Sequence, residues 1–297
     1  MARKAKVRKA KVLATGISFG EGPRWRDGRL WFSDFFDHAV KTVTPDGEVA
    51  VAFTFDDQPS GLGWLPDGDL LVVSMIRRQV LRRAATGRFS LHADLSGLAT
   101  WHCNDMTVDA QGRAYVGNFG FDLDAATAER GFQGVVADHA TATLALIEPD
   151  GGVRAAADDL HFPNGSVITP DGRTLIVGET FAGRLTAFDI APDGGLSNRR
   201  EWASVWPRLP DGACLDAEGC VWIANPAARE CVRIAQGGAV LEVIETGLTC
   251  YACMLGGDDG RTLFMTTSRP ARPDEAGAKP RGQIETVTVD AARAGSP

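Results

Sequence analysis

Four oxygen-bearing side chains occupy matched positions in this chain of 297 residues. Asn104, Asn164 and Asp211 each lie eight residues before a glycine in a turn-like segment, and Glu21 lies seven residues before one. Carboxylate and amide oxygens are the ligands that Ca²⁺, Mg²⁺ and Mn²⁺ prefer, and Zn²⁺ also accepts them. Each residue taken singly also fits a turn or strand-capping role. The shared offset favours a common site.

The glycines of these turn-like segments define repeated hairpins. Runs of strand-forming residues flank each glycine, and glycine supplies the positive φ that a tight hairpin turn needs. Six such glycines are present, namely Gly28, Gly68, Gly112, Gly172, Gly219 and Gly260. Their spacings of 40, 44, 60, 47 and 41 residues are typical of propeller blades with several strands per unit.

A second strand pair follows the first in each unit. In the first unit, for example, Val40–Thr44 and Glu48–Phe53 flank Asp46-Gly47. The last unit lacks a clear fourth strand, and Val12–Ser18 is expected to supply it and close the ring, which removes exposed sheet edges. The sequence therefore predicts an all-β fold, a six-bladed β-propeller with four-stranded antiparallel blades, formed by residues 12–297 as one domain.

In a propeller, the first strand of each blade starts on one face beside the central channel. Counting back from the turn glycines gives six such strand starts, the ring residues, which are Glu21, Ser60, Asn104, Asn164, Asp211 and Ala252. Oxygen donors from separate blades are therefore expected to meet near one axis.

The charge distribution limits the classes of partner. The first eleven residues carry six Lys or Arg, and we expect residues 1–11 to form a disordered basic tail. The net charge of −7 argues against a nucleic-acid partner. No apolar run has the length of a signal peptide or transmembrane helix, which predicts a cytoplasmic protein with no membrane partner and with reduced cysteines. A monomer or small homo-oligomer is expected.

The longest spacing, between Gly112 and Gly172, indicates an insertion at about residues 119–142. The insertion follows the second strand of its unit, so we expect it on the face that carries the ring residues. Long loops in compact domains are often lids or binding loops, and a passive surface excursion is the alternative. Only Asp124–Arg130 shows any helical periodicity. The segment Ser268–Arg281 is a further candidate for substrate contact on the same face.

Several short motifs carry a resemblance to a known family. They include Glu21-Gly-Pro-Arg-Trp25, Gln58-Pro-Ser-Gly-Leu62, Phe162-Pro-Asn-Gly165 and Pro210-Asp-Gly212. From Gly20 onward the chain resembles the SMP-30/gluconolactonase/regucalcin family of six-bladed propellers. The resemblance implies one divalent cation, Ca²⁺ first, with Zn²⁺, Mg²⁺ or Mn²⁺ as alternatives, bound by Glu21, Asn164 and Asp211. It also implies that Asn104 contacts the substrate or a metal-bound water and that Asp211 is also the general base.

The motif around Asn104 departs from the sugar-lactone hydrolases of that family. Those enzymes have an Arg two residues before the Asn, where this chain has His102 in Trp101-His-Cys-Asn104. A His can donate a hydrogen bond or take part in proton transfer, so His102 is a candidate catalytic residue, with a packed loop histidine as the alternative. Trp101 and Cys103 make this corner less polar, which favours an apolar lactone or ester over gluconolactone.

These residues predict a divalent-metal-dependent lactonase that acts on a small-molecule lactone or ester, with Asp211 assisting the attack of water on a carbonyl polarised by the metal. An organophosphate or other ester hydrolase on the same site is one alternative, and a non-enzymatic divalent-cation-binding protein is another. A metal-free condensing enzyme similar to strictosidine synthase is less favoured, because Glu21, Asn164 and Asp211 are all present.

Overall fold

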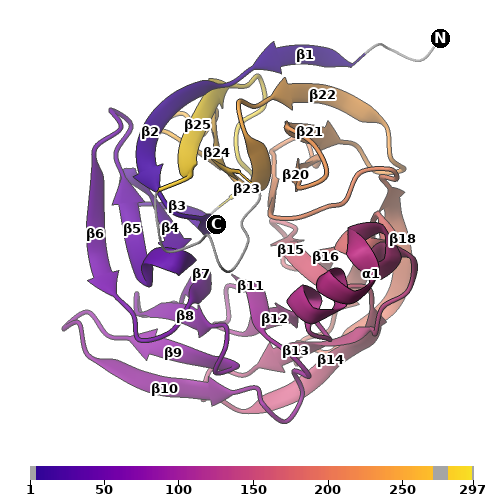
Figure 1. Ribbon diagram of the computed structural model, residues 1–297. Coiled ribbons are helices and arrows are strands. Elements are labelled where there is room, and N and C mark those ends of the chain that lie inside the picture. The colour runs from indigo at the N-terminus through magenta and orange to yellow at the C-terminus, as the bar shows by residue number, and fades with distance from the viewer. Residues whose placement is uncertain (1–4, 270–279, 296–297) are drawn as a thin grey trace.

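The structure is a computed structural model that describes residues 5–269 and 280–295. Six sheets stand side by side around a common axis (Figure 1). The innermost strand of each sheet contacts the innermost strands of its two neighbours. The prediction of a six-bladed β-propeller is therefore confirmed. Most of the candidate contact segment Ser268–Arg281 lies outside the described residues.

Strands follow one another outward from the axis in the first three blades. The first blade contains β3 (Gly20–Arg26), β4 (Arg29–Asp34), β5 (Ala39–Val43) and β6 (Val49–Thr54). The second contains β7 (Pro59–Trp64), β8 (Leu70–Ser74), β9 (Gln79–Arg83) and β10 (Phe89–Asp94). The third contains β11 (Cys103–Val108), β12 (Ala114–Asn118), β13 (Ala142–Ile147) and β14 (Val153–Leu160).

The same order holds in the other three blades. The fourth contains β15 (Pro163–Ile168), β16 (Thr174–Glu179), β17 (Arg184–Ile190) and β18 (Leu196–Ser204). The fifth contains β19 (Ala213–Leu215), β20 (Val221–Asn225), β21 (Glu230–Ile234) and β22 (Val240–Glu245). The sixth contains β23 (Thr249–Gly256), β24 (Thr262–Ser268), β25 (Gly282–Thr288) and β2 (Lys11–Ile17).

The turn glycines of the sequence repeat join the two innermost strands of every blade. All six have φ between 69° and 93°, a region that residues with a side chain rarely occupy. The sequence repeat therefore marks the hairpin nearest the axis in each blade, as predicted.

The N-terminal segment closes the ring and also extends a neighbouring blade. β2 pairs antiparallel with β25 and completes the sixth blade, as predicted. β1 (Lys6–Lys9) pairs in parallel with β22 and adds a fifth strand to the fifth blade. The prediction of a disordered tail is therefore wrong for this strand. Its basic side chains find carboxylate partners there, since Arg8 forms ion pairs of 2.7 Å with both Glu242 and Asp290.

Apolar side chains fill the space between the blades. Trp25 of the first blade stacks on Phe264 of the sixth, with ring centroids 5.2 Å apart. Trp222 of the fifth blade and Phe32 of the first belong to the same buried cluster. All six cysteines are buried free thiols. Packing between blades therefore fixes where each innermost strand lies relative to the axis.

The insertion contains an ordered helix, α1 (Leu123–Ala137), which is much longer than the Asp124–Arg130 segment expected to show helical periodicity. Asp122 caps it by accepting a hydrogen bond of 2.9 Å from the backbone amide of Ala125. The helix packs through Val135 on the fourth blade, beside Phe162 and Phe181. Neither α1 nor any other helix in the described ranges is long and apolar enough to cross a membrane.

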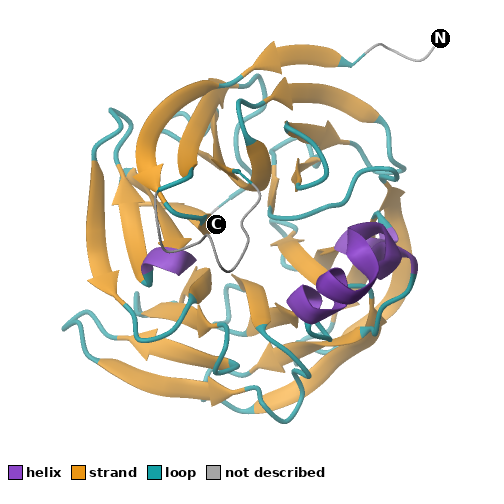
Figure 2. Ribbon diagram, in the orientation of Figure 1, coloured by secondary structure: helices purple, strands orange, loops and turns teal. Residues whose placement is uncertain are grey.

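Two short 3₁₀ segments complete the described helical structure. η1 (Phe35–Asp37) joins β4 to β5, and η2 (Thr180–Ala182) joins β16 to β17. Figure 2 shows η1 and α1 on opposite sides of the centre of the ring. Helical segments therefore flank the axis where the ring residues are expected.

Candidate active site

The innermost strands are irregular where the ring residues lie. In five of the six innermost hairpins the pairing register shifts at or beside the ring residue, at Glu21/Arg24, Pro59/Leu62, Cys103/Met106, Pro163/Ser166 and Cys250/Ala252. In the remaining hairpin, β19 begins at Ala213, just after Asp211. A β-bulge bends its strand and re-aims a side chain. The ring residues are thus released from the regular ladder and are able to turn toward the axis.

Glycines that follow four of the ring residues let the innermost strands approach closely. A Cβ on Gly61 would lie 2.4 Å from the backbone nitrogen of Met106, and a Cβ on Gly165 would lie 2.4 Å from the backbone oxygen of Asp211. A Cβ on Gly212 would lie only 2.3 Å from the Cβ of Ala252. Only glycine fits at such distances. These glycines hold the strand starts together around the axis.

Two of the predicted metal ligands, Glu21 and Asp211, are acids from distant blades that influence each other. Burial raises the pKa of Glu21 well above its ordinary value, and the charges of Asp211 and Asp105 raise it further. Burial likewise raises the pKa of Asp211, with hydrogen bonds from Asn164 and the Gly212 backbone acting in the opposite direction. Glu21 nevertheless keeps some accessible surface, so a small ligand can reach it. The structure therefore brings the carboxylates of Glu21 and Asp211 close together. No Lys or Arg is among the charges described as acting on their pKa values.

Asn164, the third predicted ligand, has its amide nitrogen in use. Its Nδ2 donates a hydrogen bond of 3.2 Å to Thr180 Oγ1, which donates in turn to the backbone oxygen of Pro210 at 2.7 Å. The same amide also hydrogen-bonds to Asp211. This leaves the amide oxygen as the atom of Asn164 suited to binding a cation.

A third acid, Asp105, lies close enough to raise the pKa of both Glu21 and Asp211, and sequence reasoning gave it no role. Its Oδ1 accepts a hydrogen bond of 3.0 Å from Arg24. Arg24 also donates to the backbone oxygens of Pro23, at 2.8 Å, and Met106. The Arg24 side chain thereby links the first blade to the third. The two residues are 81 positions apart, and no local sequence signal indicates the pairing.

Tyr251 is another neighbour that sequence reasoning missed. It immediately precedes Ala252, and burial together with the charges of Asp211 and Glu21 raises the pKa of its hydroxyl. Its ring packs on Phe19, with centroids 4.5 Å apart. Tyr251 therefore borders the two acids from the side of the sixth blade.

Asn104 and His102, the other two predicted site residues, have different surroundings. Asn104 lies on β11 and is 7% exposed. His102 stacks on Trp101, with centroids 5.0 Å apart, and burial lowers its pKa. The charges that act most on the His102 imidazole are those of Asp57, Asp122, Asp124 and Arg78. His102 thus lies at the edge of the site near the start of α1, and the main described influences on it do not include Asp211.

The family of this chain can now be stated. A model of the SMP-30/Gluconolactonase/LRE-like region matches residues 19–269, which contain every ring residue. The chain belongs to this family. The resemblance drawn from the short motifs is therefore confirmed over most of the sequence.

Individual family members are moderately similar to this chain. 6-Deoxy-6-sulfogluconolactonase of Pseudomonas putida is 27% identical over 282 residues, which cover 92% of this chain and 89% of that protein. Regucalcin of Danio rerio is 30% identical over 181 residues, which cover 59% of this chain and only 57% of that protein. A crystal structure described as a calcium-binding protein, regucalcin, from Agrobacterium tumefaciens has a TM-score of 0.79 and 21% identity over 99% of both chains. At 21% identity, the similarity to this crystal structure shows the fold alone.

The donor set suits a hard divalent cation. Across residues 5–269 and 280–295, no three His, Cys, Asp or Glu side chains form a cluster able to hold a metal ion. The site in this family member instead offers two carboxylates, Glu21 and Asp211, and the amide oxygen of Asn164. Such a set balances a dication and leaves coordination positions for water or substrate. A bound cation would relieve the repulsion between these two carboxylates.

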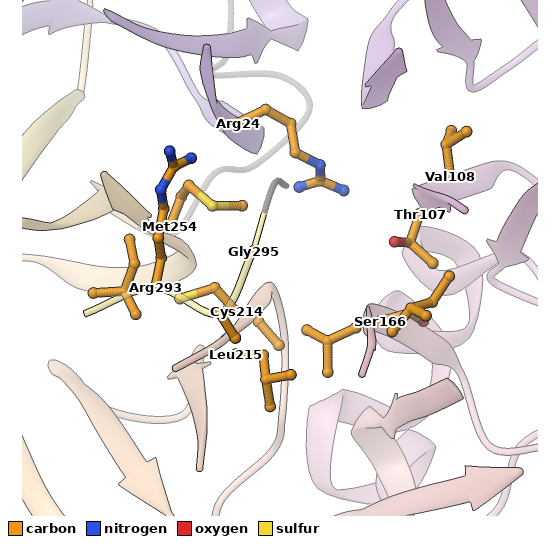
Figure 3. A pocket seen from close by; sticks show the side chains of 14 residues that line it. Arg24, Thr107, Val108, Ser166, Cys214, Leu215, Met254, Arg293 and Gly295 are labelled. Atoms are coloured by element: carbon orange, nitrogen blue, oxygen red, sulfur yellow. The ribbon is translucent and has the colours of Figure 1, made fainter. Parts of the chain in front are cut away.

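A cavity deeper along the axis is distinct from the acids. It is lined by residues that follow the ring residues in the innermost strands, such as Thr107, Ser166 and Met254, and by the C-terminal Arg293. Figure 3 shows the guanidinium of Arg24 at the margin of this cavity. None of the ring residues lines it. Arg24 therefore lies between the acids and this cavity.

Proposed function

We propose that this chain is a divalent-cation-dependent lactone hydrolase whose centre is formed by Glu21, Asn164 and Asp211. The observation that carries the proposal is the placement of the partly exposed carboxylate of Glu21 near the buried carboxylate of Asp211, to which the side-chain amide of Asn164 is hydrogen-bonded. The family supports the reaction class, because a relative similar over nearly the whole chain is named 6-deoxy-6-sulfogluconolactonase.

Each residue has a defined task in this proposal. Glu21, Asn164 and Asp211 would hold the cation, with Ca²⁺ favoured by the oxygen-only donor set. A bound cation would polarise the lactone carbonyl and stabilise negative charge on its oxygen. Asp211, when ionised, would accept a proton from the attacking water at its carboxylate, and the hydrogen bond from Asn164 orients that carboxylate. Asn104 would donate a hydrogen bond from its side-chain amide to the substrate.

The test is lactone hydrolysis with and without the acid and the cation. Asp211→Asn and chelator treatment are each expected to lower kcat by roughly 10²–10³-fold, the usual effect of losing one such stabilising group. Asp189→Asn, which changes an acid on β17 outside the site, is the matched control. Near-normal hydrolysis by both the Asp211→Asn variant and the chelated protein would refute the proposal.

Cation binding without catalysis is the second candidate. It is favoured by the uncompensated charge of Glu21 and Asp211, and a structure of the same fold is described as that of a calcium-binding protein. Titration with Ca²⁺ and a panel of lactones and phosphotriesters separates the candidates. Tight binding with no turnover of either panel favours the cation-binding protein, and turnover of phosphotriesters alone favours an organophosphate hydrolase.

A further inference from the structure

Thr180 is a buried residue whose hydroxyl bonds to the segments that carry two of the predicted cation ligands. It directly follows β16 in the fourth blade and is 4% exposed. Its hydroxyl accepts a hydrogen bond of 3.2 Å from Asn164 Nδ2 and donates one of 2.7 Å to the backbone oxygen of Pro210, the residue before Asp211. One hydroxyl therefore links the fourth blade to the chain that enters the fifth.

The backbone holds Thr180 in place independently of this hydroxyl. Its amide donates a hydrogen bond of 3.1 Å to the backbone oxygen of Phe162, two residues before Asn164. Glu179, directly before Thr180, pairs with Pro163 in the innermost hairpin of the blade. Thr180 and Asn164 are therefore carried by paired strands, and a substitution that removes only the hydroxyl leaves these backbone contacts intact.

The bonding capacity of the Thr180 hydroxyl determines which way the Asn164 amide faces. A hydroxyl has one hydrogen to donate and accepts through its lone pairs. Because the hydrogen of Thr180 goes to Pro210, the group that faces Thr180 has to be a donor, and this is the amide nitrogen of Asn164. In the opposite orientation, Oδ1 of Asn164 would have to take that hydrogen and deprive the buried Pro210 oxygen of this donor, which is costly.

Asp211 favours the same orientation. Burial raises the pKa of Asp211, and a hydrogen bond from the Asn164 side chain opposes that shift. A carboxylate accepts hydrogen bonds, so the amide nitrogen has to be the donor here as well. The two amide hydrogens of Asn164 thus have partners on Thr180 and Asp211. Within residues 5–269 and 280–295 no hydrogen bond to Oδ1 is found, and this oxygen is the atom left for a cation.

We propose that Thr180 is a positioning residue of the cation centre, whose hydroxyl keeps the amide oxygen of Asn164 free for the cation. This inference rests on the proposed function and adds a residue that itself touches neither cation nor substrate. Partners that hydrogen-bond to a metal ligand fix its orientation, and their loss typically weakens metal binding by roughly 10–100-fold. The bond to Pro210 also ties the Asn164 side chain to the peptide that carries Asp211, so one hydroxyl sets two ligands from two blades.

The experiment measures Ca²⁺ affinity by isothermal titration calorimetry on protein from which cations have been stripped. Thr180→Val keeps the shape of the side chain and removes the hydroxyl, whereas Thr180→Ser keeps the hydroxyl and removes a methyl group. We expect Thr180→Val to weaken Ca²⁺ binding about tenfold or more and Thr180→Ser to stay within about threefold of wild type. Thr246→Val is the matched control, because Thr246 is 8% exposed and its hydroxyl donates to the backbone oxygen of Leu248, away from the predicted ligands.

A carboxylate at position 164 tests the orientation directly. Asn164→Asp presents an oxygen at both positions of the amide, so the ligand atom no longer depends on Thr180. Adding Thr180→Val to Asn164→Asp should therefore change Ca²⁺ affinity by less than about threefold, against about tenfold or more in the wild-type background. An equal loss in both backgrounds shows that Thr180 acts by some route other than the amide and overturns the inference.

The remaining outcomes separate the inference from the proposed function. If Thr180→Val binds Ca²⁺ as tightly as wild type, or Thr180→Ser loses as much affinity as Thr180→Val, the role of the hydroxyl is overturned and the cation centre stands. A wild-type protein that binds none of Ca²⁺, Mg²⁺, Mn²⁺ and Zn²⁺ overturns both.

A measurement on the wild-type protein decides the matter even if Thr180→Val fails to fold. The side-chain amide signals of Asn164 can be assigned in isotope-labelled protein by their loss in Asn164→Asp. Both amide hydrogens should exchange with solvent more slowly than those of an exposed asparagine, because each has a partner. Exchange at the rate of an exposed asparagine would show an amide that is free to turn, which overturns the inference.

Discussion

Removing one partner of the buried ion pair between Arg24 and Asp105 should strongly destabilise this propeller. Both side chains are 7% exposed and their charged atoms are 3.0 Å apart. Replacing Arg24 with Met keeps much of the side-chain volume and leaves the carboxylate of Asp105 buried without its cation. Breaking a buried pair in this way typically costs about 3–5 kcal/mol. We expect the free energy of unfolding of Arg24→Met to fall by about that amount.

The expected shift in melting temperature follows from the size of the chain. A destabilisation of 1 kcal/mol lowers Tm by roughly 2 °C in proteins of this length, so Arg24→Met should melt roughly 6–10 °C below wild type. Circular dichroism melts at neutral pH with a chelator present give the measurement. The chelator keeps a bound cation from masking the change.

A second variant tests the cause. In the double variant Arg24→Met/Asp105→Asn the unpaired charge is absent, so at least half of the lost Tm should return. Arg82→Met is the matched control, because Arg82 pairs with Asp67 and Asp69 at the surface and is 33% exposed. Exposed pairs contribute little, and its expected shift is below about 2 °C. If Arg24→Met melts within 2 °C of wild type, or if the double variant is no better than the single one, this reasoning is refuted.

Three other changes test the rest of the structure. In chelated protein, Tm should fall as pH rises from about 5 to 8, because the pKa values of Glu21 and Asp211 are higher in the folded than in the unfolded state, so folding is favoured while these acids stay protonated and this stability is lost as they ionise. Glu21→Gln should make Tm depend less on pH. An equal pH dependence of Tm in both proteins contradicts the prediction. Arg8→Met should lower the free energy of unfolding by about 1–2 kcal/mol in urea melts, because it removes two ion pairs of β1. If the variant unfolds at the same urea concentration as wild type, these ion pairs do not contribute to stability. Gly165→Ala should lower Tm and weaken Ca²⁺ binding in a calorimetric titration, because the added Cβ would lie 2.4 Å from a backbone atom. Gly97→Ala is the control, since a Cβ there meets nothing within 4 Å. The prediction fails if the two variants have the same Tm and the same Ca²⁺ affinity.

The sequence predicts those features that local chemistry determines. A hairpin turn requires positive φ at one residue, so Gly112 or Gly172 can be recognised without knowing any distant contact. The repeat of such turns then gives the number of blades and the order of strands within them. Closure by the N-terminal strand follows because the last blade lacks a partner. Each of these inferences uses only neighbouring residues and the period of the repeat.

Other features depend on contacts that no local pattern reveals. β1 is stabilised because its basic side chains form ion pairs with acids such as Asp290 near the C-terminus. The sequence of β1 alone does not reveal these partners and therefore predicts a disordered tail. The helix α1 contains Gly131 with φ of 70° inside it, which weakens its periodicity. Arg24 and Asp105 meet only because the innermost strands of the first and third blades, on either side of the second blade, both lie beside the axis. Tertiary placement decided all of these.

The same distinction explains why acids are able to gather at this axis. The position of Glu21 is determined by strand pairing in the first blade, and that of Asp211 by the hydrogen bond of its backbone amide to Ala224 in the fifth, so their repulsion acts against two separately stabilised sheets. Neither blade can relieve the repulsion by moving alone, because the glycines beside the ring residues pack against neighbouring backbone. The repulsion therefore raises the pKa values of the carboxylates instead of moving either blade. A fold that loses little by holding such a pair is well suited to keeping a cation centre preformed before any ligand arrives.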